Sequence, residues 1–283
     1  MIRRKHYAAL ILAGVFFGTT GTAQALGPKG VSGMAVGSAR LICGALLLWL
    51  FTRFSPRSSE KMPERDLWLA AIGIALYQLT FFSAVRSTGV AIGTVTALGS
   101  APALTGVIAF FLVGEKPSRR WFIATIITTL GIIVLATAKG FSHFNVVGFA
   151  LAICAGATYS LFAVTSKRAL NTGVGIPEAM SRIFALAAVL AFPFLFVGNF
   201  HPLISSRGLL MIFWLGLIPT AIAYIAYAYG LHGVRASTAS TLILAEPATA
   251  TLLAAVVLGE SLNIKNWIGI AIIATGLIYL SRE

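Results

Sequence analysis

Ten apolar runs, each close to 20 residues long, dominate the sequence and leave short polar connectors between them. About 20 apolar residues in a helix cross the hydrocarbon core of a bilayer. Transmembrane strands would need alternating polar and apolar residues, which these runs lack. The sequence therefore predicts an all-α polytopic membrane protein with ten transmembrane helices. The predicted spans are 7–26, 33–53, 66–85, 90–113, 120–138, 147–168, 177–197, 208–230, 236–258 and 266–281.

The composition excludes an ordinary soluble enzyme. Apolar residues make up 58% of the 283 residues and charged residues only 10%, against about half and about a quarter in soluble domains. No connector is long enough to hold a soluble domain, so residues 1–283 are expected to form a single membrane domain. Cys43 and Cys154 lie in separate apolar runs, and both are expected to be buried small side chains.

The charge balance predicts the topology. A formal net charge of +13 would suggest a nucleic-acid partner for a soluble protein. Here 14 of the 21 Lys and Arg residues lie on the side of the N-terminus, five lie in loops on the opposite side and two lie within spans. Because cytoplasmic loops are rich in Lys and Arg, both termini are predicted to be cytoplasmic and the protein to lie in an inner membrane. The positive charge is then explained by topology, and no nucleic-acid partner is expected. A cleaved signal peptide ending near Ala25 is the alternative for the first run.

The second half of the sequence resembles the first half when shifted by 145 residues. The predicted repeats, 7–138 and 147–281, hold five spans each, an odd number, so the second repeat is expected to be inverted relative to the first. Inverted repeats are typical of secondary transporters, in which two halves rock about a central site. The matched positions are Pro102 with Pro247, Gly114 with Gly259, and Glu115 with Glu260.

These motifs resemble the drug/metabolite transporter superfamily, EamA type, over residues 7–281. The resemblance rests on the ten spans, on Ala101-Pro102 and Glu246-Pro247 in the fourth span of each half, and on the Gly-Glu pairs that follow. It implies export of small metabolites, commonly amino acids, without ATP hydrolysis by the protein; YddG-like exporters are similar in size and layout. The first half departs from the pattern, with Ala101 where the second half has Glu246.

Two prolines and one acid lie deep within spans. Pro102 and Pro247 each free a backbone carbonyl, and as a pair they predict helix breaks on the transport pathway; a packing kink is the alternative. Glu246 is the only acid deep in a span, and a buried carboxylate is a functional hypothesis by default. It could bind a substrate ammonium, exchange a proton, or pair with a neighbouring helix.

Two arginines lie within spans and are matched by a shift of 142 residues, Arg40 and Arg182. Arg40 lies about seven residues, roughly 10 Å, from the outer end of its span. Arg182 lies at a similar depth from the inner end of its span. Their side chains could snorkel to the two interfaces. Alternatively, they are candidate gates, and each guanidinium attracts a substrate carboxylate at its own end of the transport pathway.

Aromatic and neutral polar residues gather at mid-depth in three spans. Together they predict a pocket for a modest, partly apolar solute whose polar end is oriented by hydroxyl and amide groups. Helix packing is the alternative for each residue taken alone. With Glu246, the predicted pathway comprises Tyr77, Gln78 and Phe81 in the third span, Tyr159 and Ser160 in the sixth, and Tyr224 and Tyr227 in the eighth.

No residue combination predicts catalysis, a metal site or a cofactor. Asp66 is the only Asp, the four His residues are far apart, and no phosphate-binding loop or nucleophile motif is present.

The predicted function is a secondary transporter exporting small metabolites, amino acids first among them, with or without proton coupling. A channel-like facilitator and a lipid-linked carrier flippase are the alternatives. Small-residue pairs such as Gly14 and Gly18 predict close helix packing, in a monomer or a homodimer.

Overall fold

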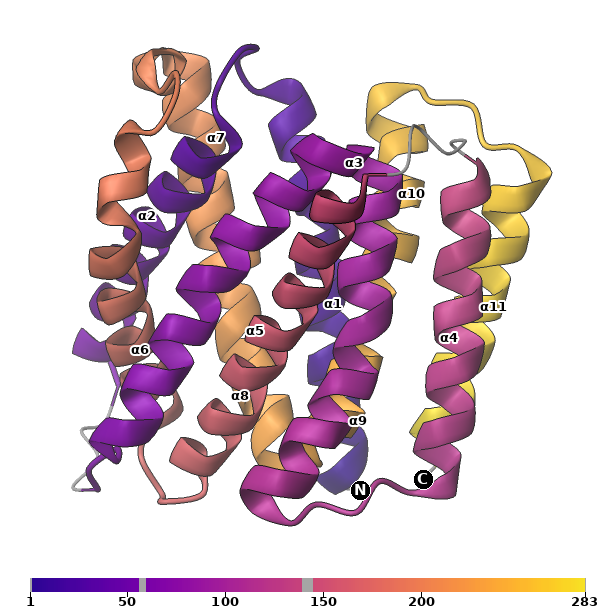
Figure 1. The fold of residues 1–283 in the computed structure, drawn as a ribbon. Coiled ribbons are helices and arrows are strands. Elements are labelled where there is room, and N and C mark those ends of the chain that lie inside the picture. The colour runs from indigo at the N-terminus through magenta and orange to yellow at the C-terminus, as the bar shows by residue number, and fades with distance from the viewer. Residues whose placement is uncertain (1, 56–59, 139–144, 283) are drawn as a thin grey trace.

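The structure, a computed structural model, describes residues 2–55, 60–138 and 145–282; Arg57, Lys139 and His143, used in the charge and histidine arguments, lie outside them. Ten helical segments in the described ranges are long and apolar enough to cross a membrane, as the sequence predicts. They form one bundle with both termini at the same end (Figure 1). The elements are α1 Ile2–Leu26, α2 Gly33–Arg53, α3 Glu64–Val113, α4 Arg119–Ala138, α5 Val146–Leu170, α6 Ile176–Ala191, η1 Phe192–Phe196, η2 His201–Ile204, α7 Ser206–Gly216, η3 Leu217–Ile222, α8 Ala223–Gly233, α9 Ala236–Leu242, α10 Ala245–Leu258 and α11 Ile264–Ser281.

Helix α3 contains two spans, Glu64–Val85 and Ile92–Val113. The sequence predicts a connector at 86–89, but helical backbone continues through it. Residues eight apart in a straight helix are separated by about 12 Å, yet a methyl group on Gly93 would lie 3.0 Å from the Cα of Val85. The helix therefore reverses sharply, and its two arms meet at the end opposite the termini (Figure 1).

The ninth span is interrupted between α9 and α10. Pro247 cannot donate to the carbonyl of Ile243, four residues earlier. The backbone N–H of Glu246 donates to that carbonyl instead, at 2.8 Å. The interruption therefore lies one turn before Pro247 and puts Glu246 in the first turn of α10.

The predicted break at Pro102 is wrong, because Pro102 lies inside the continuous α3. Hydroxyl groups of neighbouring spans satisfy carbonyls beside it: Ser160 Oγ donates to the carbonyl of Ala101 at 3.0 Å, and Thr129 Oγ1 donates to that of Gly99 at 3.4 Å. The carbonyl that Pro102 leaves without its helical donor is that of Leu98, four residues earlier, and these two contacts are to carbonyls close to it in the chain.

The helix pairings connect the two halves of the chain. Helix α2 packs against α6, α4 against α11, α1 against α8 and α10, and both arms of α3 against α5. This set of pairings stays the same if each of the first five spans is exchanged with the span five places later in the chain. The pairings of α2 with α6 and of α4 with α11 then map onto themselves, and those of α1 with α8 and α10 map onto those of α5 with the two arms of α3.

The outer surface is apolar and the interior is aromatic. Exposed Leu, Ile, Val and Phe side chains cover the outward faces of the helices, as a bilayer requires. Inside, Phe162, Phe184 and Tyr227 are fully buried and their rings pack together. The expectation that both cysteines are buried is wrong for Cys154, which is exposed because its side of α5 lies on the outside of the bundle.

Replacing Gly131 by Leu is expected to destabilise the protein by about 1–3 kcal/mol or more, as overpacking does. Helices α4 and α11 touch at this glycine: a Cβ there would lie 2.7 Å from Ile273 Cγ1 and 2.9 Å from the carbonyl oxygen of Gly269. The measurement is thermal unfolding in detergent. Gly21→Leu is the matched control, because a Cβ at Gly21 meets nothing within 4 Å; equal melting temperatures for the two variants would contradict this packing.

Candidate functional site

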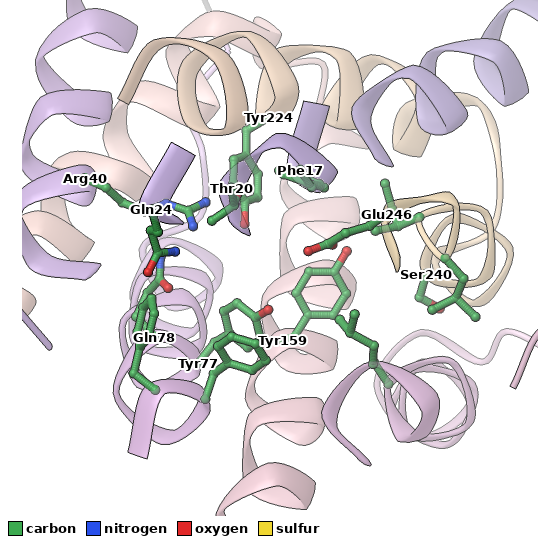
Figure 2. Close-up of a pocket in the computed structure, with 16 residues that line it drawn as sticks. Phe17, Thr20, Gln24, Arg40, Tyr77, Gln78, Tyr159, Tyr224, Ser240 and Glu246 are labelled. Carbon is green, nitrogen blue, oxygen red and sulfur yellow. The ribbon is translucent and has the colours of Figure 1, made fainter. Parts of the chain in front are cut away.

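A cavity lies between the two halves of the chain, in the part of the bundle opposite the termini. The space between its lining atoms, including its open mouth, is about 630 Å³. Its walls come from the first four spans and from α5, α8, α9 and α10, and several of its polar side chains point into one space (Figure 2). The lining residues are Phe17, Thr20, Gln24, Arg40, Tyr77, Gln78, Phe81, Phe82, Leu98, Ala101, Tyr159, Tyr224, Ser240, Ile243, Leu244 and Glu246.

Glu246 supplies the acidic wall of the cavity. Its carboxylate makes no hydrogen bond or ion pair with a residue that the structure describes. Because Glu246 lies in the first turn of α10, the positive end of the helix dipole favours its negative charge. A carboxylate held in this way can bind a cationic group of a solute.

Two glycines of α1 bring that helix against the interruption in the ninth span. A Cβ on Gly14 would lie 3.0 Å from the carbonyl oxygen of Ile243, and a Cβ on Gly18 would lie 2.9 Å from that of Glu246. Only glycine permits this approach of backbone to backbone. The predicted small-residue pair therefore packs within the chain, and it positions Glu246.

Arg40 supplies the basic wall and does not snorkel to an interface, because it is only 7% exposed. Pro219 disrupts the hydrogen bonding of the eighth span, which forms a π-turn there, η3. Arg40 Nε donates to Thr220 Oγ1 at 3.2 Å, and its terminal amino group donates to the carbonyl of Pro219 at 3.2 Å. Two of its five N–H groups are thus engaged, and the remainder can bind a carboxylate in the cavity.

Aromatic rings form the floor between these charges. Tyr77 packs against Phe81 and Tyr159, with ring centroids 5.5 and 5.6 Å away. Phe17 packs against Tyr224 at 4.9 Å. The rings come from α1, α3, α5 and α8 and provide an apolar surface for the body of a solute.

Two side-chain amides lie beside Arg40. Figure 2 shows Gln24 and Gln78 on the side of the cavity where the guanidinium of Arg40 lies, with Glu246 pointing in from another wall. Gln78 is 4% exposed, and neither amide hydrogen-bonds to a described residue. A buried amide without a partner is costly, so the amide of Gln78 is placed to meet a solute or water. Gln24 is half-buried and lines the same space.

Most of the residues predicted for the pathway meet at this cavity. Tyr77, Gln78, Phe81, Tyr159, Tyr224, Glu246 and the candidate gate Arg40 line it. The others do not. Ser160 is fully buried and accepts a hydrogen bond from Thr105. Tyr227 packs against the rings of Tyr159 and Tyr224, which line the cavity. Pro102 and Pro247 are each next to a lining residue.

Arg182, the second candidate gate, lies elsewhere. It forms an ion pair with Glu64 at 3.3 Å near the end of the bundle that carries the termini, and its side chain is 36% exposed. Its counterpart Arg40 is held by the π-turn at Pro219, whereas the third span has no proline to create such a turn. A gating role for Arg182 stays a prediction.

Sequence reasoning missed the contribution of the first span. Phe17, Thr20 and Gln24 occupy one face of α1, at spacings of three and four residues, and all three line the cavity. The signal was present, since Gln24 is an amide within an apolar run, the criterion that selected Gln78. Among the described residues, no group of three or more His, Cys, Asp or Glu side chains could hold a metal ion.

The sequence profile of the EamA-like transporter family matches the chain twice, over residues 4–137 and 146–282. The chain belongs to this family. Its members are transporters of the drug/metabolite transporter superfamily. The two matched segments are close to the repeats predicted from the sequence, and together they cover nearly the whole chain.

Individual relatives agree with this assignment. The chain is 38% identical to the uncharacterized transporter YwfM of Bacillus subtilis, over 96% of this chain and 92% of that protein. It is 29% identical to the threonine/homoserine exporter RhtA of Salmonella typhimurium, over 82% of this chain and 76% of that protein. A solved crystal structure with 21% sequence identity shares the fold, with a TM-score of 0.83 over 97% of this chain and 95% of the other.

Contacts to α9 hold the two halves of the chain together at the end of this transporter that carries the termini. Both carboxylate oxygens of Glu115 accept from the backbone N–H of Ala236, at 3.2 and 3.1 Å. The indole N–H of Trp121 donates to the carbonyl of Ser237 at 2.8 Å. Glu115 belongs to the first Gly-Glu motif, so one role of that motif is to cap a half-helix from the other half of the chain.

Replacing Glu115 by Ala is expected to open this end about fivefold more often, because a lost helix cap costs about 1 kcal/mol. The reporter is a cysteine at Thr238, which is 3% exposed and lies beside Glu115, in a background without Cys43 and Cys154. Labelling by an impermeant thiol reagent on the side of the termini should accelerate. Glu178→Ala removes an acid at the same end and should leave the labelling rate unchanged. Equal labelling rates in the two variants would show that the contact of Glu115 with α9 does not hold this end together.

Proposed function

We propose that this chain is a secondary transporter that exports small zwitterionic metabolites, amino acids first among them, by alternating access. One observation carries the proposal: a buried cavity between the two halves has Arg40 on one wall, Glu246 on another and aromatic rings between them. A guanidinium can bind a carboxylate in a bidentate manner, and a carboxylate can bind an ammonium. The similarity to a threonine/homoserine exporter supports this substrate class.

We further propose that the chain consists of two inverted repeats and lies in the cytoplasmic (inner) membrane with both termini in the cytoplasm. The double family match and the helix pairings that survive exchange of the halves support the repeats. The excess of Lys and Arg on the side of the termini supports the orientation. In this orientation the cavity faces away from the cytoplasm, and the contacts of Glu115 close the cytoplasmic end.

The experiment is a counterflow screen in proteoliposomes with amino acids, nucleosides and quaternary amines, with and without an imposed pH gradient. Saturable exchange of amino acids is the expected result. Flux that rises linearly with concentration would indicate a channel-like facilitator, and movement of a lipid-linked carrier without amino-acid exchange would indicate a flippase. A rate that depends on the pH gradient would assign proton coupling, and an independent rate would assign facilitated exchange.

A further inference from the structure

A second hollow lies on the outside of the bundle, where α1, α7 and α10 meet at the end opposite the termini. The space between its lining atoms is about 1350 Å³. Each helix contributes one face, with residues three or four positions apart. Leu26 of α1, Leu210 and Trp214 of α7, and Leu253 and Val257 of α10 lie along it.

The walls of this groove are apolar and face outward. Leu26 is 59% exposed, Leu210 68% and Val257 48%. In a membrane protein, such outward faces contact lipid chains. The groove is therefore a place where an acyl chain can lie between helices, with contacts on three sides.

One charged residue, Arg207, lines the groove. It is the second residue of α7, where the chain enters the eighth span, and its side chain makes no ion pair or hydrogen bond with a described residue. The backbone beside it is already capped, because Ser205 Oγ accepts from the N–H of Gly208 at 3.1 Å. The free cation at this position is suited to an anion at the membrane interface.

The dimensions match one lipid molecule. Trp214 follows Arg207 by seven residues, about 10 Å along the helix axis, and the hydrocarbon of one leaflet is about 15 Å deep. The cation thus lies at the interface and the apolar groove at the depth of the acyl chains. We propose that this groove binds one anionic phospholipid, with its phosphate at Arg207 and an acyl chain between α1, α7 and α10.

Trp214 provides a direct test, because phospholipids with brominated acyl chains quench tryptophan on contact. The full chain is reconstituted with brominated phosphatidylglycerol or brominated phosphatidylcholine, and each variant is measured with and without Trp214→Phe to isolate the signal of this residue. Quenching of Trp214 by the anionic lipid is expected at about fivefold lower mole fraction than by the zwitterionic lipid. Equal quenching by the two lipids would overturn the proposal.

Two variants separate the headgroup from the groove. Arg207→Gln should remove the preference for the anionic lipid, whereas Lys265→Gln, at the same end but outside the groove, should keep it. Ala23→Phe fills the groove, which Ala23 lines, and leaves Arg207 in place; it should reduce quenching by both lipids. A preference for the anionic lipid that persists in Arg207→Gln, or quenching that is unchanged by Ala23→Phe, would contradict the site. If Arg207→Gln does not fold, Ala23→Phe decides.

Discussion

Replacing Glu246 by Gln is expected to lower the transport efficiency for a zwitterionic substrate by about ten- to a hundredfold. The substitution keeps the size of the side chain but removes its charge, and a hydrogen bond to a charged group contributes about 1.5–3 kcal/mol. Glu246→Ala should lose at least as much. The measurement is the initial rate of counterflow across a range of substrate concentrations.

Loss of folding would not explain this result. The carboxylate of Glu246 makes no hydrogen bond with a described residue, so neither variant removes a contact on which the bundle depends, and their melting temperatures should stay close to that of the unmodified protein. Glu178→Gln, an acid outside the cavity, is the matched control and should transport normally. Normal transport by both Glu246 variants would show that this carboxylate does not contact the substrate.

Replacing Arg40 by Lys is expected to raise the KM for a substrate with a carboxylate by about tenfold or more. The ammonium of lysine keeps the positive charge but lacks the planar fork that engages the π-turn and a carboxylate at the same time. Arg40→Ala should also destabilise the protein, by about 1–3 kcal/mol, because the carbonyl of Pro219 loses its donor in a buried site. Concentration-dependent counterflow separates the effect on KM from that on the maximal rate.

Arg182→Lys is the comparison for this variant, because Arg182 occupies the matched position in the second half of the chain. Its ion pair with Glu64 is partly exposed, and such pairs contribute little. We expect a smaller loss of transport than for Arg40→Lys. If Arg182→Lys impaired transport as much as Arg40→Lys, the position of Arg40 in the cavity wall would not explain its effect on transport.

The spans were predictable because a bilayer imposes one length and one polarity on every helix that crosses it. The charges within spans were predictable candidates, because an ionised group is costly in hydrocarbon. The same criterion selected Arg182 together with Arg40 and Glu246, and it did not separate the two arginines. Neither inference needed knowledge of which helices are neighbours.

The remaining features depend on contacts between distant parts of the chain. Nothing near Arg40 in the sequence indicates that it binds the carbonyl of Pro219, 179 residues later. Similarly, Pro102 and Pro247 match in the sequence, but only the second lies beside an interruption of its helix. Such differences depend on contacts with distant parts of the chain, which the local pattern does not contain.

The most direct test of a zwitterion site between Arg40 and Glu246 uses modified competitors. Counterflow of the best amino acid is measured against an excess of the same amino acid, its carboxamide and its N-acetyl derivative. The account predicts that only the parent compound competes, because the carboxamide cannot pair with Arg40 and the N-acetyl compound cannot pair with Glu246. Competition by both derivatives as strong as that of the parent would contradict it.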